Sequence, residues 1–214
     1  MIAGPTPTWR TVLLDLDRTL VDVESQVDYC SALAELEHAG FRHPAGLGPA
    51  TSWGNCTRQV VDLLVGLDDG SEWLRADQLV VPHELAGAHR AAAMPGLAEL
   101  LAAVATRPVG IVTLLSGPAT EVVLDRHALA VDTVVPRRHD VPAKPRPEQL
   151  LTALHALGSP PGEAVMIGDS ERDEMAADAA GVDFIGVTNG RDDHRFTGPR
   201  VVGDLGEVAA LLRP

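Results

Sequence analysis

Two aspartates follow an apolar run near the start of the chain, in the segment Thr-Val-Leu-Leu-Asp-Leu-Asp-Arg-Thr-Leu at residues 11–20. In an extended chain Asp15 and Asp17 point to the same side, so both carboxylates reach one pocket. Two buried anions repel each other and lose hydration, which a cation or a shared proton must compensate. The pair therefore indicates catalytic or metal-binding chemistry, although Asp residues also end strands and begin polar turns.

Three further segments carry chemically competent side chains. A second apolar run ends at Thr113, Lys144 precedes a predicted helix, and a third run leads into Asp169 and Asp173. Lys144 is the only lysine among seventeen basic residues. Because a planar guanidinium does not replace a compact ammonium, this single lysine favours a chemical requirement over the alternative of an exposed residue in a proline-rich connector.

These four segments, in this order, resemble the four motifs of the haloacid dehalogenase superfamily of phosphohydrolases, over about residues 11 to 190. The sequence that follows the fourth segment is also similar to the usual helix, strand and loop of that family. Two positions depart from the family pattern. Arg18 stands where many members have glycine, and Leu114 stands where asparagine is common.

Apolar runs that alternate with helical segments predict an α/β fold, a Rossmann-like, doubly wound and mostly parallel sheet. Strands are expected to end near Leu16, Thr113, Val135, Gly168 and Val187. Helices are expected over 96–106, 118–128, 147–157 and 171–180, with a last helix in 203–214. In open sheets of this kind a ligand binds beyond the carboxyl ends of the strands. The candidate residues fall at such ends.

The pattern changes to helices between residues 22 and 93, at 24–39, 52–65, 71–79 and 83–92, with Gly40 ending the first and Pro82 the third. The resemblance implies a small helical cap, of the kind found in phosphoglycolate phosphatases and β-phosphoglucomutases, inserted in a hydrolase core at 9–21 and 94–214. Such caps close over a site and select small substrates. Residues 1–8 are expected to form a flexible arm.

The resemblance also implies roles for the motif residues. Asp15 is expected to form an aspartyl-phosphate, and Asp17 to act as general acid and base. Mg²⁺ is the implied cofactor, with Asp15, the backbone carbonyl of Asp17 and Asp169 as ligands. Thr113 and Lys144 are expected to bind the phosphoryl group.

Some assignments stay open at this point. Ser116 rivals Thr113 as the phosphate-binding hydroxyl. Asp173 lies beside the metal ligands, caps a helix with Ser170, or does both. Arg18 is a possible substrate contact that could reach across the site toward the cap. Further possible contacts, within the cap, are Thr51, Trp53, Asn55 and Arg58, whose alternative roles are helix capping and packing.

The predicted function is a Mg²⁺-dependent phosphatase that acts on a small phosphorylated metabolite. A phosphomutase of the β-phosphoglucomutase kind is the alternative, and a catalytically silent binding protein on the same fold is a further one. The net charge of −13 argues against a nucleic-acid partner. No apolar stretch approaches the ~18 residues of a membrane span, and the start lacks the features of a signal peptide, which predicts a cytoplasmic protein. Cys30 and Cys56 are expected to be reduced thiols without a role.

Overall fold

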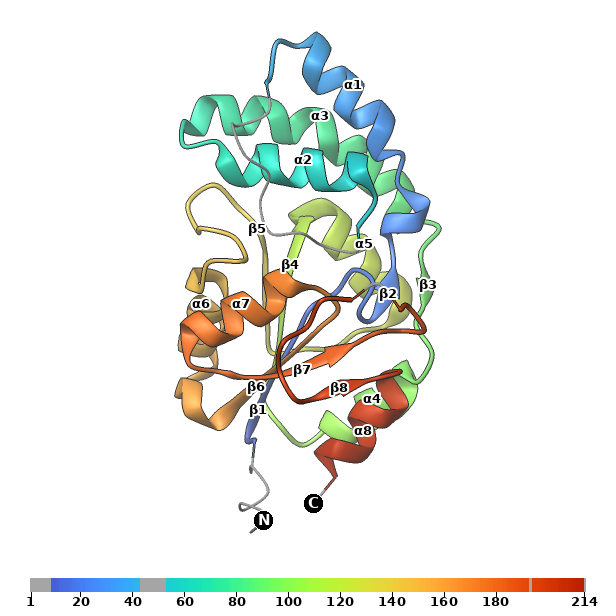
Figure 1. The fold of residues 1–214 in the computed structure, drawn as a ribbon, viewed down its shortest axis with the longest axis vertical. Helices are drawn as coiled ribbons and strands as arrows, with labels where there is room; N and C mark the ends of the chain where they lie inside the picture. The colour runs from blue at the N-terminus through green and yellow to red at the C-terminus, as the bar shows by residue number, and fades with distance from the viewer. Residues whose placement is uncertain (1–8, 43–52, 193, 214) are drawn as a thin grey trace.

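The structure, a computed structural model, describes residues 9–42, 53–192 and 194–213. Within these residues six parallel strands form one sheet in the order β5-β4-β1-β6-β7-β8 (Figure 1). Because the chain runs outward from β1 first on one side and then on the other, the connections diverge beyond its carboxyl end. The strands are β1 (Thr11–Leu14), β4 (Val109–Ser116), β5 (Thr133–Arg137), β6 (Ala164–Gly168), β7 (Asp183–Val187) and β8 (Val201–Val202).

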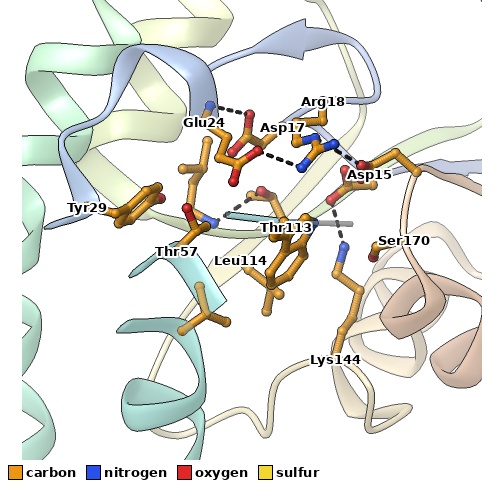
Figure 2. Close-up of a pocket in the computed structure, with 14 residues that line it drawn as sticks. Asp15, Asp17, Arg18, Glu24, Tyr29, Thr57, Thr113, Leu114, Lys144 and Ser170 are labelled. Carbon is orange, nitrogen blue, oxygen red and sulfur yellow. Dashed lines mark hydrogen bonds and ion pairs between the residues drawn. The ribbon is translucent and has the colours of Figure 1, made fainter. Parts of the chain in front are cut away.

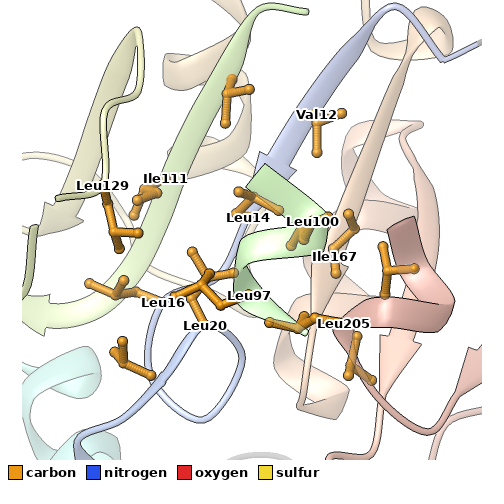
Figure 3. Packing of buried hydrophobic residues seen from close by; sticks show 14 of the residues in the cluster. Val12, Leu14, Leu16, Leu20, Leu97, Leu100, Ile111, Leu129, Ile167 and Leu205 are labelled. Atoms are coloured by element: carbon orange, nitrogen blue, oxygen red, sulfur yellow. The ribbon is translucent and has the colours of Figure 1, made fainter. Parts of the chain in front are cut away.

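Successive side chains of β1 pack on opposite faces of the sheet, as the pleat requires. Val12 and Leu14 join a core with α4 (Leu97–Val104), α5 (Gly117–His127) and α8 (Leu205–Leu212), which Figure 3 shows. Leu13 joins a second core with α6 (Glu148–Leu157) and α7 (Glu171–Ala180). Helices on both faces explain why the strands read as continuous apolar runs, and the predicted fold class is confirmed.

The helices expected along the second half of the chain are confirmed to within two residues at each end. The tail differs slightly from the prediction, because the short strand β8 precedes α8. Strand β8 and the 3-10 turn η2 (Pro161–Glu163) are too short to give a periodic signal. Among the described residues, no helix is both long and apolar enough to cross a bilayer.

A helical segment leaves the sheet after β1. It contains η1 (Glu24–Gln26), α1 (Tyr29–His38), α2 (Asn55–Gly66) and α3 (Gly70–Ala88), between the short strands β2 (Val21–Asp22) and β3 (Ala92–Ala93). These two strands pair antiparallel and bring the ends of the segment together. Figure 1 shows its helices above the carboxyl ends of the sheet. We call residues 22–93 the helical insertion; its division from a separate core stays a prediction.

Two predictions fall on residues that the structure does not describe. These are the flexible arm at 1–8 and the possible substrate contact Thr51. The expected helix over 24–39 is divided, because η1 comes first and Asp28 then caps α1 by accepting from the backbone N–H of Ser31. The insertion has an apolar core of its own, to which α1, α2 and α3 all contribute.

The prediction that Pro82 ends a helix is wrong, since α3 continues through it to Ala88. Ala76, Val80, Glu84 and Ala88 are buried at intervals of four residues, so both halves of α3 pack through one face. Pro82 lies on the exposed face. Because Pro82 has no backbone N–H, one carbonyl of α3 lacks its helical hydrogen bond. This carbonyl lies on the exposed face, where water can reach it.

The expectation of two reduced thiols is also wrong, because Cys30 and Cys56 form a disulfide. They are the second residues of α1 and α2, and their Cα atoms lie 5.0 Å apart, within the range that a disulfide spans. A sequence separation of 26 gives no sign of this pairing. It depends on how α1 packs against α2.

The double variant Cys30→Ser/Cys56→Ser should lower the free energy of unfolding by about 3 kcal/mol, because the disulfide closes a loop across a separation of 26 residues in the unfolded chain. Urea unfolding followed by circular dichroism would measure the loss. Reductant should destabilise the wild type and leave the double variant unchanged. Two titratable thiols in unreduced, denatured wild-type protein would contradict the disulfide.

Candidate active site

A buried ammonium joins three neighbouring strands at their carboxyl ends. Lys144 Nζ donates to Asp15 Oδ1 at 2.7 Å, to Asp173 Oδ1 at 2.5 Å and to the carbonyl of Val112 at 2.9 Å. Asp15 follows β1, Val112 lies in β4 and Asp173 lies in α7, which follows β6. Burial lowers the pKa of Lys144, but the charges of Asp15 and Asp173 outweigh burial and raise it above its ordinary value. Lys144 therefore stays charged.

The carboxylate of Asp15 is held at both oxygens. Oδ1 accepts from Lys144, and Oδ2 accepts from the hydroxyl of Thr19 at 2.8 Å. Burial raises the pKa of Asp15 to about 6, while the charge of Lys144 opposes the rise. Asp15 is thus ionised in neutral solution. Figure 2 shows it facing Lys144 across the site.

The second aspartate of the pair, Asp17, turns toward the start of η1. Its Oδ1 accepts from the backbone N–H groups of Val23 at 2.8 Å and Glu24 at 2.9 Å. Burial, together with the charges of Glu24 and Asp15, raises the pKa of Asp17 to about 8, although the two hydrogen bonds oppose the rise. The pKa of Asp17 thus lies above that of Asp15, so Asp17 holds a proton more readily than Asp15 does. Two carboxyl groups with separated pKa values are suited to different roles in acid–base and nucleophilic chemistry.

Three buried carboxylates converge at the same end of the sheet. One oxygen each of Asp15, Asp169 and Asp173 lies within 4.8 Å of the others. Burial raises the pKa of Asp169 well above its usual range, and the charges of Asp15 and Asp173 add to this. Arg191 contacts Asp169 Oδ2 at 2.8 Å, and Arg18 Nε lies 3.5 Å from the same oxygen. Hard divalent cations prefer such all-oxygen sets, so this cluster can hold one.

The carboxylate of Asp173 accepts hydrogen bonds from two residues, Ser170 and Lys144. Its Oδ2 accepts from the backbone N–H and the hydroxyl of Ser170 at 3.1 and 2.6 Å, which forms a capping box at the start of α7. Helix capping by Asp173 is therefore confirmed, while Oδ1 accepts from Lys144. Gly168 makes room for this arrangement, because a Cβ there would lie 2.5 Å from the Asp173 side chain. A side chain at position 168 would force the carboxylate away.

Arg18 adopts a φ of 61°, the left-handed region that favours glycine. For a residue with a Cβ this backbone costs about 1–2 kcal/mol. Its guanidinium lies 2.6 Å from Glu24 Oε2 as well as beside Asp169, and the Asn189 side chain donates to its carbonyl at 2.7 Å. These contacts offset the backbone cost and place a cation beside the carboxylate of Asp169.

Asp15, Asp17, Arg18, Lys144 and Asp169 border one cavity, together with side chains from the helical insertion and from β4. Its volume of about 30 Å³ leaves room for only a few water molecules. The helical insertion thus covers the carboxylates and leaves little space beside them. The lining residues are Asp15, Asp17, Arg18, Glu24, Tyr29, Trp53, Thr57, Val61, Thr113, Leu114, Leu115, Lys144, Asp169 and Ser170.

The two candidate hydroxyls differ in position. Thr113 lines the cavity, and its Oγ1 accepts from the backbone N–H of Leu115 at 3.2 Å. Ser116 is buried outside this lining, and its hydroxyl has no hydrogen-bond partner among the described residues. The position of Thr113 favours it as the phosphate-binding hydroxyl, a role that stays a prediction.

The possible substrate contacts in the helical insertion are only partly brought to the cavity. Trp53 lines it. Asn55 is exposed. Arg58 Nε lies 3.8 Å from Asp62 Oδ2, one turn further along α2. The geometry gathers Asp15, Asp17, Thr113, Lys144 and Asp169 in one place, and their catalytic and binding roles stay predictions.

Residues 9–181 match the family model of the haloacid dehalogenase-like hydrolases. The chain belongs to this family. Solved structures with the same fold include CbbY from Rhodobacter sphaeroides in complex with phosphate, with a TM-score of 0.69, 20% identity, and coverage of 95% of this chain and 98% of that one. A putative phosphoglycolate phosphatase from Lactobacillus delbrueckii gives a TM-score of 0.69 at 19% identity, covering 96% and 99% of the two chains.

Curated relatives of this hydrolase are phosphatases. Phosphoglycolate phosphatase 1 of Pseudomonas aeruginosa is 30% identical over 203 residues, which cover 87% of this chain and 72% of that protein. The probable phosphatase IndB of Dickeya dadantii is 27% identical, with 94% of both chains covered. The predicted family and the predicted enzyme class, a phosphatase, are confirmed.

A buried charge network joins the helical insertion of this hydrolase to the sheet, and sequence reasoning missed it. Arg137 on β5 donates to Glu84 Oε1 and to the carbonyl of Leu114, both at 2.7 Å, and to Asp77 Oδ1 at 2.6 Å. Glu84 Oε2 accepts from the backbone N–H of Ser116 at 2.9 Å. Helix α3 is thus fixed to the carboxyl end of β4. Residues 53 apart on a helix and a strand give no sequence signal for this pairing.

Sequence reasoning also missed Glu24, which links two parts of the site. Its Oε2 accepts from Arg18 at 2.6 Å, and its Oε1 accepts from the backbone N–H of Gly54 at 2.9 Å. It therefore connects the loop after β1 to the start of α2. An acid seven residues after Asp17 was a weak signal, because it could equally have been a solvated residue of the expected helix.

The variant Glu84→Ala should lower the free energy of unfolding by about 3–5 kcal/mol, because Arg137 and the amide of Ser116 lose a buried partner. Glu72→Ala on the same helix is the matched control, since Glu72 pairs with Arg75 at the surface. It should cost about 0–1 kcal/mol. Chemical denaturation of both variants would measure the difference. Equal losses would show that the Glu84 network adds no stability beyond that of a surface pair.

Proposed function

We propose that this chain is a Mg²⁺-dependent phosphatase that hydrolyses a small phosphorylated metabolite through an aspartyl-phosphate on Asp15. The observation that carries the proposal is the placement of the two aspartates in one cavity. Asp15 is held by Lys144 and Thr19, and burial raises the pKa of Asp17 above that of Asp15. This arrangement supports a nucleophile and an acid side by side.

In the first step the Asp15 carboxylate attacks phosphorus, and the bond between phosphorus and the leaving alcohol oxygen breaks. Asp17 gives its proton to that oxygen, so the alcohol leaves neutral. In the second step water attacks the phosphorus of the aspartyl-phosphate. Asp17 takes a proton from this water, and the bond from phosphorus to Asp15 breaks to release inorganic phosphate. The two steps return both aspartates to their starting states.

The buried carboxylate cluster fits a magnesium ion, because every donor is a hard oxygen and the crowded negative charge needs compensation. Asp15, Asp169 and the backbone carbonyl of Asp17 would hold the ion, with Asp173 beside them. When bound, Mg²⁺ neutralises charge on the phosphoryl oxygens. Thr113 donates a hydrogen bond to the same oxygens, and the positive charge of Lys144 attracts them while Lys144 keeps Asp15 in place.

A small phosphorylated substrate is supported by the relatives, several of which are named phosphoglycolate phosphatases. A sugar phosphomutase remains the alternative, since it would use the same two aspartates. A panel of phosphate esters with Mg²⁺, assayed for inorganic phosphate, tests the proposal. Release of phosphate supports hydrolysis, and an isomerised sugar phosphate without release supports the phosphomutase.

The variant Asp15→Asn should lower kcat by at least about 10³-fold while the protein still folds, because the amide keeps the side-chain size and loses nucleophilicity. Asp22→Asn is the matched control, since Asp22 hydrogen-bonds Ser25 outside the cavity. It should keep wild-type turnover. Phosphate release is the measurement, with circular dichroism as the check on folding. Wild-type release from Asp15→Asn would overturn the aspartyl-phosphate mechanism.

Removal of metal by a chelator should abolish phosphate release, and Mg²⁺ should restore it. Mg²⁺ should also raise the melting temperature of the wild type, because it binds buried carboxylates that repel one another. Asp169→Asn should lose this thermal response together with activity. Full activity after elemental analysis has verified metal removal would contradict the metal assignment.

A further inference from the structure

The lining of the cavity includes apolar and aromatic groups from the helical insertion and from β4. Tyr29 lies in α1 and Val61 in α2, while Trp53 precedes α2. Leu114 and Leu115 lie in β4. We call these five residues the apolar wall. Figure 2 shows Tyr29 and Thr57 across the cavity from Lys144 and Ser170. A substrate whose phosphoryl group lies at Asp15 would turn its alcohol part toward this wall.

Trp53 is supported from outside the cavity by a buried ion pair. The Arg172 guanidinium lies 5.2 Å from the centre of the indole ring. Arg172 is 1% exposed and pairs with Asp62, which is itself buried on α2. A cation held against one face of the ring restricts its motion. The indole is thus fixed before a substrate arrives, which lowers the entropy lost on binding.

Tyr29 offers its ring rather than its hydroxyl. The side chain is buried, and its hydroxyl donates to Glu84 Oε1 at 3.4 Å, a long hydrogen bond within the charge network at α3. Because this polar end has a protein partner, the ring is what remains for contact with a ligand. Tyr29 and Trp53 together present aromatic surface, which favours apolar or ring-shaped groups.

The cations of the cavity are already compensated. Lys144 and Arg18 are the two cations among the described residues that line the cavity. Lys144 pairs with Asp15 and Asp173, and Arg18 lies 2.6 Å from Glu24 and 3.5 Å from Asp169. A second anionic group on a substrate would have to take Arg18 from Glu24. That exchange would leave the Glu24 carboxylate without its cation, beside a further negative charge.

We propose that the site selects phosphate monoesters whose alcohol is uncharged and presents an apolar or ring face to Trp53 and Tyr29. It discriminates against esters that carry a second anionic group, such as a carboxylate. This inference rests on the proposed phosphatase function and adds the class of leaving group. The expected substrate class therefore excludes phosphoglycolate, after which several of the relatives are named.

Benzyl phosphate and 2-phosphoglycolate test the inference, because both are primary alkyl phosphates that differ in the charge and ring of the alcohol. With Mg²⁺, wild-type kcat/KM for benzyl phosphate should exceed that for phosphoglycolate by about tenfold or more. Trp53→Ala should reduce this preference by about fivefold, mainly through a higher KM for benzyl phosphate. Trp53→Phe should keep most of it, since a ring remains.

Trp73→Ala is the matched control, because its indole packs against His139 outside this cavity. It should leave the preference unchanged, and thermal unfolding should show that each variant folds. Equal or greater efficiency of the wild type on phosphoglycolate would overturn the inference while leaving the phosphatase function in place. The same holds if Trp53→Ala keeps the full preference for benzyl phosphate. Release of phosphate from neither ester, nor from any other, would instead refute the proposed function and the inference with it.

Discussion

The ammonium of Lys144 is the interaction on which the rest of the site depends. It lies in the core at 1% exposure, where an unpaired charge would cost several kcal/mol. Its three acceptors belong to β4, to the residue after β1 and to the helix after β6, which are neighbours in the sheet. The register of those strands must therefore be correct for Lys144 to be satisfied. Correct strand pairing and correct placement of the carboxylates thus depend on each other.

Much of the core could be predicted from the sequence because parallel strands gather their carboxyl ends. Once β1, β4 and β6 were recognised as apolar runs, Asp15, Thr113 and Asp169 had to meet at one edge. Lys144 was distinguished as the only lysine and by its place before a predicted helix in one of the four ordered segments. The capping box of Asp173 was also foreseeable, since it depends on spacing within a single turn of helix.

The helical insertion was less predictable because its organisation depends on contacts that are distant in sequence. The disulfide, the Glu84–Arg137 pair and the Arg172–Asp62 pair each join residues on different elements. No local pattern reports such pairings. Pro82 is a further case in which local sequence failed to predict the structure. The packing of one continuous helix face outweighed a strong local signal for a helix end.

The disulfide has a mechanical consequence for the apolar wall. Cys30 directly follows Tyr29, and Cys56 directly precedes Thr57, so the covalent bond lies between two side chains that border the cavity on separate helices. Helices joined only by side-chain packing can shear past one another. A bond at this point limits how far α1 and α2 can shift relative to each other. The part of the cavity lining that these two helices supply is thus held together, while Leu114 and Leu115 belong to β4.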